Sequence, residues 1–506
     1  MNLSSTRLAS SPRIVYWSMA GFMIAVIGWA AFQTPLGAYF YGSDYWPHAA
    51  AIKEWSANLA HPGHPQIAGG QATSLFVPAN LVVTLLAAAF NLSPMTAMGV
   101  AAILNLIILF GGIYAFSRVY FAHRWAPVLV LGVFTLAWGN ALPWSGMIQA
   151  KGLLFVASYP STQALGLAWG AIALAIAMMR SQIGAWWPYP ALAALSTVIL
   201  ASHPLSGALL LISIGIAALT EESSWKLRAG TLGAATSALL LVEAWPWHSF
   251  WRIVTSRSGI NEPVWEQFRD PTHMAVALGP LLLGIGAAWL LARRHEHPLI
   301  VLGLAVTTAV WAIDHVVSLP LGHRFLHFSG YFMGLALVAL LLTEHSRRVT
   351  TAAWWAAGSA VALNVALVGL TLAGYMIWPV ANATSFDWST EPVVAEMRTL
   401  TAPLAANSVV LADQDFAHPV AAFEGKVVAL SSSALDGLLS NGEQLLADTE
   451  LFLQAGTSHS IREAIIARRS VTHVLFDSSA LSLEEVAQHG QVVATAGDLV
   501  MVEIQR

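Results

Sequence analysis

Apolar stretches long enough to cross a membrane recur along most of this chain, and they restrict what it can fold into. A helix needs about 20 apolar residues to span a bilayer. Hydrophobic residues make up 57% of the 506 residues and charged residues only 10%, whereas soluble domains carry about 25% charge. The sequence therefore predicts a polytopic α-helical membrane protein. The predicted spans are 15–33, 95–116, 125–142, 161–180, 186–201, 205–220, 229–245, 274–292, 298–316, 328–343 and 350–378.

A further apolar stretch, 75–90, decides the topology. If it spans, the basic residues of all later loops face outward, against the cytoplasmic preference of Lys and Arg. If it lies on the outer surface, those residues share the cytoplasm with Arg7 and Arg13. We therefore predict about eleven spans, a cytoplasmic N-terminus and an integral plasma (inner) membrane location, with 75–90 as a juxtamembrane helix in an external loop, 34–94. The residues concerned are Arg118, Arg124, Arg180, Lys226, Arg228, Arg293, Arg294, Arg347 and Arg348.

The last part of the chain is more highly charged, and its apolar runs are shorter. Alternating strands and helices predict a small α/β domain. Because an odd number of predicted spans follows a cytoplasmic N-terminus, this domain is predicted to be external (periplasmic). We therefore divide the chain into a transmembrane domain, 1–380, and an external α/β domain, 381–506. The predicted elements are strands at 408–413, 426–430 and 471–477, a helix at 461–469 and a hairpin at 492–504 around Gly497-Asp498.

Several classes of chemistry are absent from the sequence. The chain has no Cys, which excludes disulfides, thiolate metal sites and Cys nucleophiles. It has no Walker-type phosphate loop and no dinucleotide-binding fingerprint. We therefore expect neither a nucleotide cofactor nor a nucleic-acid partner, and we expect membrane lipids as neighbours.

Polar and charged residues gather at the external ends of the predicted helices. Gly42–His48 and His61–Pro65 follow the first span, and charged groups at a membrane face commonly mark a functional site. Six basic residues lie externally against the usual bias, which indicates an anionic ligand there; interfacial snorkelling is the alternative. They are Lys53, Lys151, Arg252, Arg257, Arg269 and Arg324.

This layout resembles the GT-C superfamily of membrane glycosyltransferases, in its bacterial form. One helix leads into a long external loop with an acid near its start, Asp44. An external turn carries His203-Pro204, and an external Arg, Arg324, opens a late helix. Pro-containing segments at His64-Pro65 and 76–80, and the tail pattern at 467–476, complete the resemblance.

The resemblance implies a polyprenyl-phosphate-linked sugar as donor, a glycan or lipid of the cell envelope as acceptor, and transfer at the external face, usually with inversion. It gives Asp44 the role of general base and Arg324 the binding of the carrier phosphate. The metal-dependent oligosaccharyl branch carries further acids in its second external loop, whereas 143–160 contains Lys151 and no acid. A reaction without metal or other cofactor is therefore favoured, and a divalent metal is not excluded.

Two carboxylates are candidate catalytic groups. Asp44 is the only Asp in the loop 34–94, and an acceptor hydroxyl needs a base to become a good nucleophile. The alternative is that Ser43 or Asp44 caps a helix. Glu54, about three helical turns later, is the second candidate base; its alternative is an ordinary surface acid.

The other candidates bind the donor phosphate or the sugars. Arg324 suits phosphate oxygens, and its alternative is an ion pair with Asp314. The remaining phosphate candidates are Lys151, His203, Arg252 and Arg257, with snorkelling, a structural His and an amphipathic interfacial helix as their alternatives. The spacings of the external histidines match no metal motif, so we expect hydrogen bonding instead and predict no metal site. The substrate-binding candidates are His48, His64, Tyr159, His323 and Trp247.

The sequence thus favours an inverting glycosyltransferase. One alternative is a transporter or flippase of lipid-linked glycans, which predicts ionisable groups at mid-membrane depth on several helices. The sequence instead places them at external helix ends. A glycan polymerase or ligase shares the same chemistry and stays open.

Overall fold

The computed structural model falls into two compact units. It describes residues 11–33, 38, 43–69, 73–139, 145–183, 185–255, 270–317, 319, 322–343, 351, 358–359, 362, 366, 393–430 and 441–505. The first unit comprises Met1–Ala30, Ala102–Ala244 and Asn261–Ala381, and the second comprises Ala31–Ala101, Trp245–Ile260 and Asn382–Arg506. The compact units thus group part of the loop 34–94, which is predicted to be external, with the tail, and the domain boundary at 380/381 stays a prediction.

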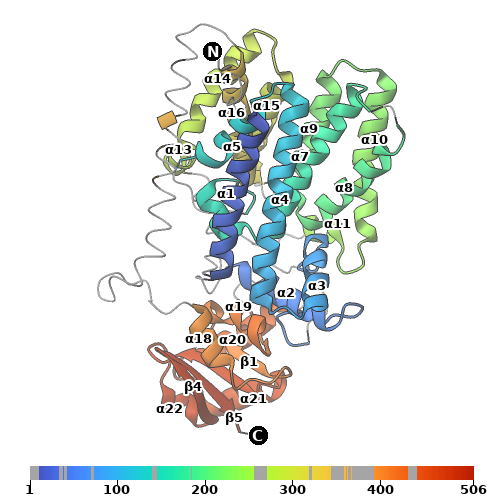
Figure 1. Ribbon diagram of the computed structural model, residues 1–506. Helices are drawn as coiled ribbons and strands as arrows, with labels where there is room; N and C mark the ends of the chain where they lie inside the picture. The colour runs from blue at the N-terminus through green and yellow to red at the C-terminus, as the bar shows by residue number, and fades with distance from the viewer. Residues whose placement is uncertain are drawn as a thin grey trace, which may run out of the picture. The chain divides into compact units, whose positions relative to one another are not determined.

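The first unit is a set of apolar helices running side by side (Figure 1). Together with α1 and α4, parts of which belong to the second unit, they confirm a helical multi-span membrane protein. Their bounds are α1 (Pro12–Gln33), α4 (Pro94–Phe121), α5 (Ala126–Leu136), α6 (Ala150–Val156), α7 (Pro160–Met179), α8 (Pro188–Ser202), α9 (Pro204–Thr220), α10 (Trp225–Leu241), η2 (Val242–Ala244), α13 (Pro271–Leu278), η3 (Gly279–Leu282), α14 (Leu283–Arg293), α15 (Pro298–Val317), η4 (Gly322–Arg324) and α16 (Phe325–Leu342).

Six helical segments of the described residues are long and apolar enough to cross a membrane. Four further predicted spans correspond to the shorter helices α5, α8, α9 and α10, and the predicted span 350–378 lies almost entirely outside the described residues. The number eleven therefore stays a prediction. The six segments are Pro12–Gln33, Pro94–Phe121, Pro160–Met179, Thr272–Arg293, Pro298–Val317 and Gly322–Leu342.

Proline fixes where several of these helices begin. Pro160, Pro188 and Pro204 each stand in the first turn of their helix, where the missing N–H costs nothing and the fixed φ is already helical. The predicted starts of these spans at 161, 186 and 205 therefore lie within two residues of the observed ones.

Glycines allow two helices of the first unit to touch backbone to backbone. A Cβ on Gly112 of α4 would lie 1.9 Å from the carbonyl oxygen of Gly166 on α7. A Cβ on Gly166 would in turn lie 2.5 Å from the backbone of Leu109. Membrane helices use small residues in this way because close packing replaces the hydrophobic effect between them.

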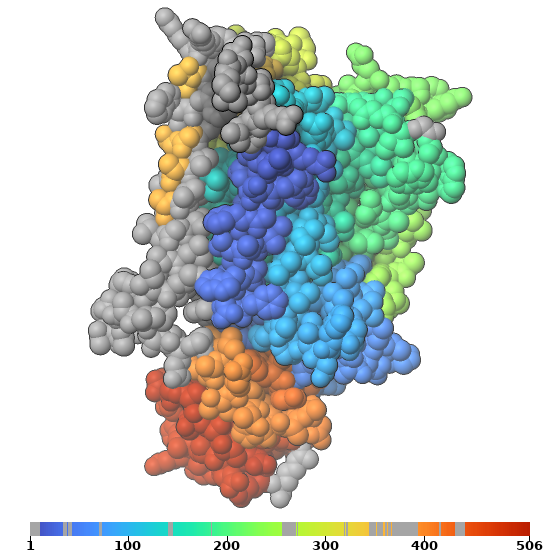
Figure 2. Space-filling model, viewed as in Figure 1, coloured from blue at the N-terminus to red at the C-terminus, as the bar shows by residue number. Residues whose placement is uncertain are grey.

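Helix α1 lies on the surface of the first unit (Figure 2). The hydroxyl of Tyr16 donates to the carbonyl of Phe110 on α4 at 2.5 Å. The opposite side exposes large apolar side chains, including Ile14, Phe22 and Trp29. Such a face suits contact with lipid.

Polar side chains join four helix ends at one end of the first unit. The guanidinium of Arg180, after α7, donates to Glu221 at 2.7 and 2.8 Å and to the carbonyl of Val119 at 2.7 Å. The rings of Tyr120 and His297 lie 5.6 Å apart. The ends of α4, α7 and α9 thus meet the start of α15, as expected for loops on one side of a membrane; that this side is cytoplasmic stays a prediction.

The second unit contains a mixed five-stranded sheet in the order β2-β1-β3-β5-β4. β2, β1 and β3 are parallel, and β3, β5 and β4 are antiparallel. Its elements are α2 (Tyr45–Ala57), α3 (Pro78–Phe90), α11 (Phe250–Thr255), α18 (Val393–Thr401), β1 (Val409–Ala412), α19 (Gln414–Phe423), β2 (Lys426–Val427), α20 (Gly442–Leu453), α21 (His459–Arg469), β3 (His473–Asp477), α22 (Leu483–Ala487), β4 (Gly490–Ala496) and β5 (Leu499–Ile504).

The sheet confirms the predicted C-terminal α/β module. β4 and β5 form the predicted hairpin, in which Ala496 pairs with Leu499. Gly497 in the two-residue turn has φ +56°, a conformation that favours glycine. The second predicted strand is shorter than expected, since β2 holds only Lys426 and Val427.

Candidate functional site

Asp44 stands at the start of α2 in the second unit. It occupies the N-cap position, but its side chain makes no capping hydrogen bond. The hydroxyl of Ser43 accepts from the amide of Tyr45 instead, at 3.1 Å. Asp44 is exposed, whereas Tyr45 and Trp46 beside it are buried. The Ser43 hydroxyl and the buried rings of Tyr45 and Trp46 therefore stabilise the start of the helix. The Asp44 carboxylate makes no capping hydrogen bond there.

Two opposed ion pairs join α2 to the end of α19 and to the start of β2. Lys53 Nζ lies 3.4 Å from a carboxylate oxygen of Glu424, and Lys426 Nζ lies 2.7 Å from one of Glu54. Lys53 also donates to the carbonyl of Phe423 at 2.6 Å, the favourable place for a cation at a helix C-terminus. Burial lowers the pKa of Lys53, and the nearby carboxylate of Glu424 opposes that shift.

Both carboxylate oxygens of Glu54 make contacts within the second unit. One carboxylate oxygen binds Lys426, and the other accepts from the amide of Gly63 at 2.9 Å. These contacts favour a structural role, and a catalytic role for Glu54 stays a prediction.

The segment after α2 adds a short pairing to the edge of the sheet. The amide of Val427 donates to the carbonyl of Gln66 at 2.8 Å, and the amide of Ala68 donates to Val427 at 2.9 Å. Ile67 and Val427 thus form a parallel bridge on β2. His64, buried at 2% exposure, holds this segment because its Nδ1 accepts from the amides of Gln66 and Ile67.

The contact between Glu54 and Lys426 gives a stability prediction. We expect Glu54→Gln to lower the free energy of unfolding by about 1 kcal/mol, because the pair is partly exposed but also hydrogen-bonded. We expect Lys426→Met to cost a similar amount, and the double variant to cost less than the sum of the two. Denaturant unfolding of the purified chain in detergent measures all three; strict additivity would contradict a direct pair.

His48 and Trp247 lie in packed surroundings within the second unit. The Nδ1 of His48 is 3.3 Å from the side-chain nitrogen of Asn80. Burial lowers the pKa of His48 to about 4, so its imidazole is neutral at neutral pH. The ring of Trp247 lies 4.8 Å from that of Trp55, in a cluster that also contains Phe76. His48 and Trp247 thus both make structural contacts, and substrate binding by either residue stays a prediction.

Arg324, in the first unit, is the N-cap residue of α16. Its neighbour His323 is fully buried. A Cβ on Gly322 would lie 2.7 Å from the side chain of Asp314, itself fully buried at the end of α15. Asp314 therefore lies close to the turn that precedes Arg324, as the sequence predicts.

The segment 145–160, which is predicted to be external, lies beside helices α16 and α9 of the first unit. The hydroxyl of Tyr331 on α16 donates to the carbonyl of Gly146, and a Cβ on Gly146 would lie 3.8 Å from the ring of His203. His203 caps α9, with its Nδ1 accepting from the amide of Ser206 at 3.3 Å. This capping contact agrees with the structural alternative considered for this histidine.

Lys151 and Tyr159 belong to the same segment. Lys151 is in the first turn of α6 and half-buried, and burial lowers its pKa. Tyr159 is buried and occupies the N-cap position of α7, and its carbonyl accepts from the side chain of Asn105 at 3.1 Å.

The predicted site residues thus fall into two groups, one in each unit. Arg252, on the exposed face of α11, belongs to the second unit, and Arg257 lies outside the described residues. The second unit holds Asp44, Glu54, His48, His64, Trp247 and Arg252, and the first holds Arg324, His323, Lys151, Tyr159 and His203. Glu424 and Lys426 are not predicted from the sequence, although Lys53 and Glu54 carry charges opposite to theirs.

Neither a protein-family model nor a curated protein matches the sequence. Solved structures do match. ArnT from Cupriavidus metallidurans in the apo state gives a TM-score of 0.57 at 13% identity, over 96% of this chain and 97% of that one. ArnT bound to undecaprenyl phosphate gives 0.53 at 12% identity, with the same coverage.

An archaeal structure matches as well. The Archaeoglobus fulgidus oligosaccharyltransferase in complex with zinc and sulfate gives a TM-score of 0.51 at 14% identity, over 90% of this chain and 68% of that one. The likeness includes both the apolar helices and the C-terminal mixed sheet. The chain therefore has an ArnT-like fold, in agreement with the fold that the resemblance in its sequence implies.

Proposed function

We propose that this chain is an inverting glycosyltransferase that moves a sugar from a polyprenyl-phosphate carrier to an acceptor hydroxyl at the external face of the membrane. The observation that carries the proposal is the match to ArnT over nearly the full length of both chains. One of the matching ArnT structures is bound to undecaprenyl phosphate, which supports a polyprenyl phosphate as the carrier here.

In the proposed reaction, Asp44 takes the proton of the acceptor hydroxyl. The acceptor oxygen then attacks the anomeric carbon, the bond from that carbon to the phosphate oxygen breaks, and the polyprenyl phosphate leaves with the electron pair. Arg324 offsets the negative charge of the leaving phosphate. The exposure of Asp44 supports its role, as does the fact that its side chain makes no capping hydrogen bond.

The other basic residues play a secondary part in this proposal. Lys151 lies half-buried on a segment that contacts α16 through Tyr331, which suits a role at the carrier phosphate. The reaction is proposed to need no metal, because 143–160 carries no acid that would supply a carboxylate ligand.

A transfer assay with the purified full-length chain tests the proposal. Radiolabelled polyprenyl-phosphate sugars and an envelope extract serve as donor and acceptor. We expect transfer that persists in chelator, and a KM for the donor raised about tenfold or more in Arg324→Gln, because a charge-assisted contact to phosphate is lost. Saturable donor binding without turnover, across donors and extracts, would instead favour transport of lipid-linked glycans.

A further inference from the structure

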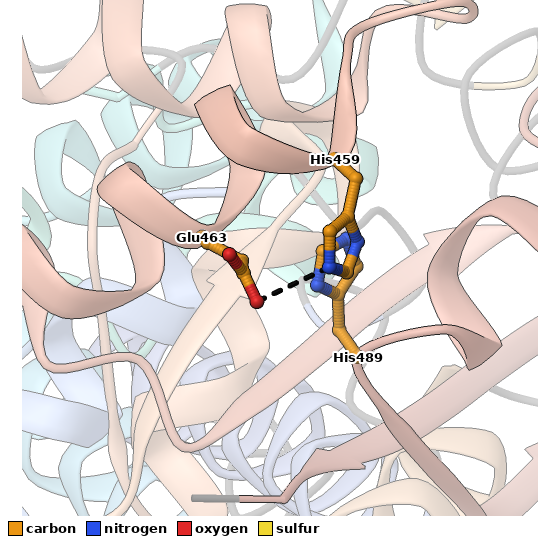
Figure 3. Close-up of side chains that lie close together, drawn as sticks. All are labelled: His459, Glu463 and His489. Carbon is orange, nitrogen blue, oxygen red and sulfur yellow. Dashed lines mark ion pairs between the residues drawn. The ribbon is translucent and has the colours of Figure 1, made fainter.

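Three side chains that can bind a metal converge in the C-terminal part of the second unit (Figure 3). His459 is the first residue of α21, and Glu463 lies one turn further along the same helix. His489 comes from the segment between α22 and β4. One potential ligand atom from each residue lies within 4.8 Å of the other two.

Two of these atoms are already close to the separation that a shared ion requires. His459 Nε2 lies 3.1 Å from Glu463 Oε1. Zinc binds nitrogen and carboxylate oxygen at about 2.0–2.2 Å, so tetrahedral ligand atoms lie about 3.3–3.6 Å apart. The start of α21 therefore already brings two of the three potential ligand atoms close together.

His489 supplies an independent indication of a ligand. The residue is only 7% exposed, and its Nε2 is buried without a hydrogen-bond partner among the described residues. A buried polar atom left unsatisfied costs about 1–3 kcal/mol, so such atoms in native structures need an explanation. Its ring faces that of His459 at 4.3 Å between centroids, as Figure 3 shows.

The surrounding charges accommodate a dication. The nearest buried cation is Arg462, and its guanidinium donates to the carboxylate of Glu485 at 2.6 Å. It also donates to the carbonyls of Phe452 and Gln454, each at 3.0 Å. Its positive charge is thus offset locally, while Glu463 adds a negative charge directly at the site.

We propose that His459, Glu463 and His489 bind one divalent transition-metal ion, with zinc as the favoured ion and water as the fourth ligand. The two imidazole planes lie 12° apart, so they are stacked and their lone pairs do not yet converge. The side chain of His459 is 49% exposed and is free to rotate off the stack toward the ion. The ion would then connect the start of α21 to the segment that leads into β4.

A zinc ion at this site would stabilise the C-terminal α/β module, and its binding is independent of the proposed sugar transfer. The experiment uses the full-length chain without an affinity tag, in detergent, stripped with chelator and dialysed. Zinc chloride is titrated calorimetrically. The test variant is His459→Ala/Glu463→Gln, because both residues are exposed and their loss should leave the fold intact. The matched control, His61→Ala/Glu443→Gln, removes the same two groups at exposed positions elsewhere.

We expect one zinc ion per chain in the wild type and the control, and at least about tenfold weaker binding in the test variant, since even supporting residues of metal sites contribute that much. Zinc should also raise the unfolding temperature of the wild type and of the control variant, but not that of the test variant. Equal binding by test and control variants, or no saturable binding by the wild type, would overturn the proposal. The test variant should retain sugar transfer, which separates this site from any metal needed for catalysis.

Discussion

Asp44→Asn is expected to lower the turnover number for sugar transfer by about 10²–10⁴-fold, the usual contribution of a general base. Asn has the same shape but cannot accept the proton of the acceptor hydroxyl. Because Asn keeps the size of the side chain and the residue is exposed, the substitution should change the unfolding temperature little. The donor KM should also stay near the wild-type value.

Glu54→Gln is the matched control for that measurement, because it also converts a carboxylate of the same loop to an amide. It should unfold more easily, since Glu54 binds Lys426 and Gly63, but it should keep most of the transfer activity. The opposite pattern, with transfer retained in Asp44→Asn and lost in a folded Glu54→Gln, would assign the base to Glu54.

Gly112→Ala is expected to destabilise the first unit by about 3 kcal/mol or more, at the upper end of the cost of overpacking. The added methyl group would lie 1.9 Å from the carbonyl oxygen of Gly166 and 3.2 Å from the backbone nitrogen of Gly170. Both neighbours are backbone atoms, so no side chain can rotate away and α4 and α7 must separate. Thermal unfolding in detergent and the yield of monodisperse protein measure the effect.

Gly111→Ala is the control, one residue earlier on the same helix. A Cβ at Gly111 meets nothing within 4 Å, and alanine is the better helix former. The control should therefore be neutral or slightly stabilising. Equal stability of the two variants would contradict the close contact of α4 with α7.

The sequence predicted the general architecture because the features that encode it are local. Spanning length follows from runs of apolar residues, and helix starts follow from Pro160, Pro188 and Pro204. The hairpin around Gly497 is likewise signalled by neighbouring residues. Each of these features depends on chemistry within a few positions, so no knowledge of distant contacts was required.

The candidate site was less predictable because its residues take their roles from distant partners. Glu54 is a candidate base in the sequence, which does not reveal its contact with Lys426, 372 positions away in the chain. His64 is a substrate-binding candidate in the sequence, which does not reveal that it is buried and accepts from two backbone amides. Trp247 is likewise a substrate-binding candidate, and the sequence does not show that its ring packs on Trp55. Polarity marks such residues but does not say what satisfies them.

The pairing of Ile67 with Val427 has a consequence for how the protein is made. Lys426, beside that bridge, lies 362 residues after His64, to whose carbonyl it donates. At about 5–20 residues per second, the ribosome needs roughly 20–70 s to synthesise that interval. During this time the segment 64–68 lacks both the strand β2, with which Ile67 pairs, and Lys426, which donates to the carbonyl of His64. Its final conformation is therefore a late event of biogenesis, and a chain that stops before β2 leaves the loop without the partner that orders it.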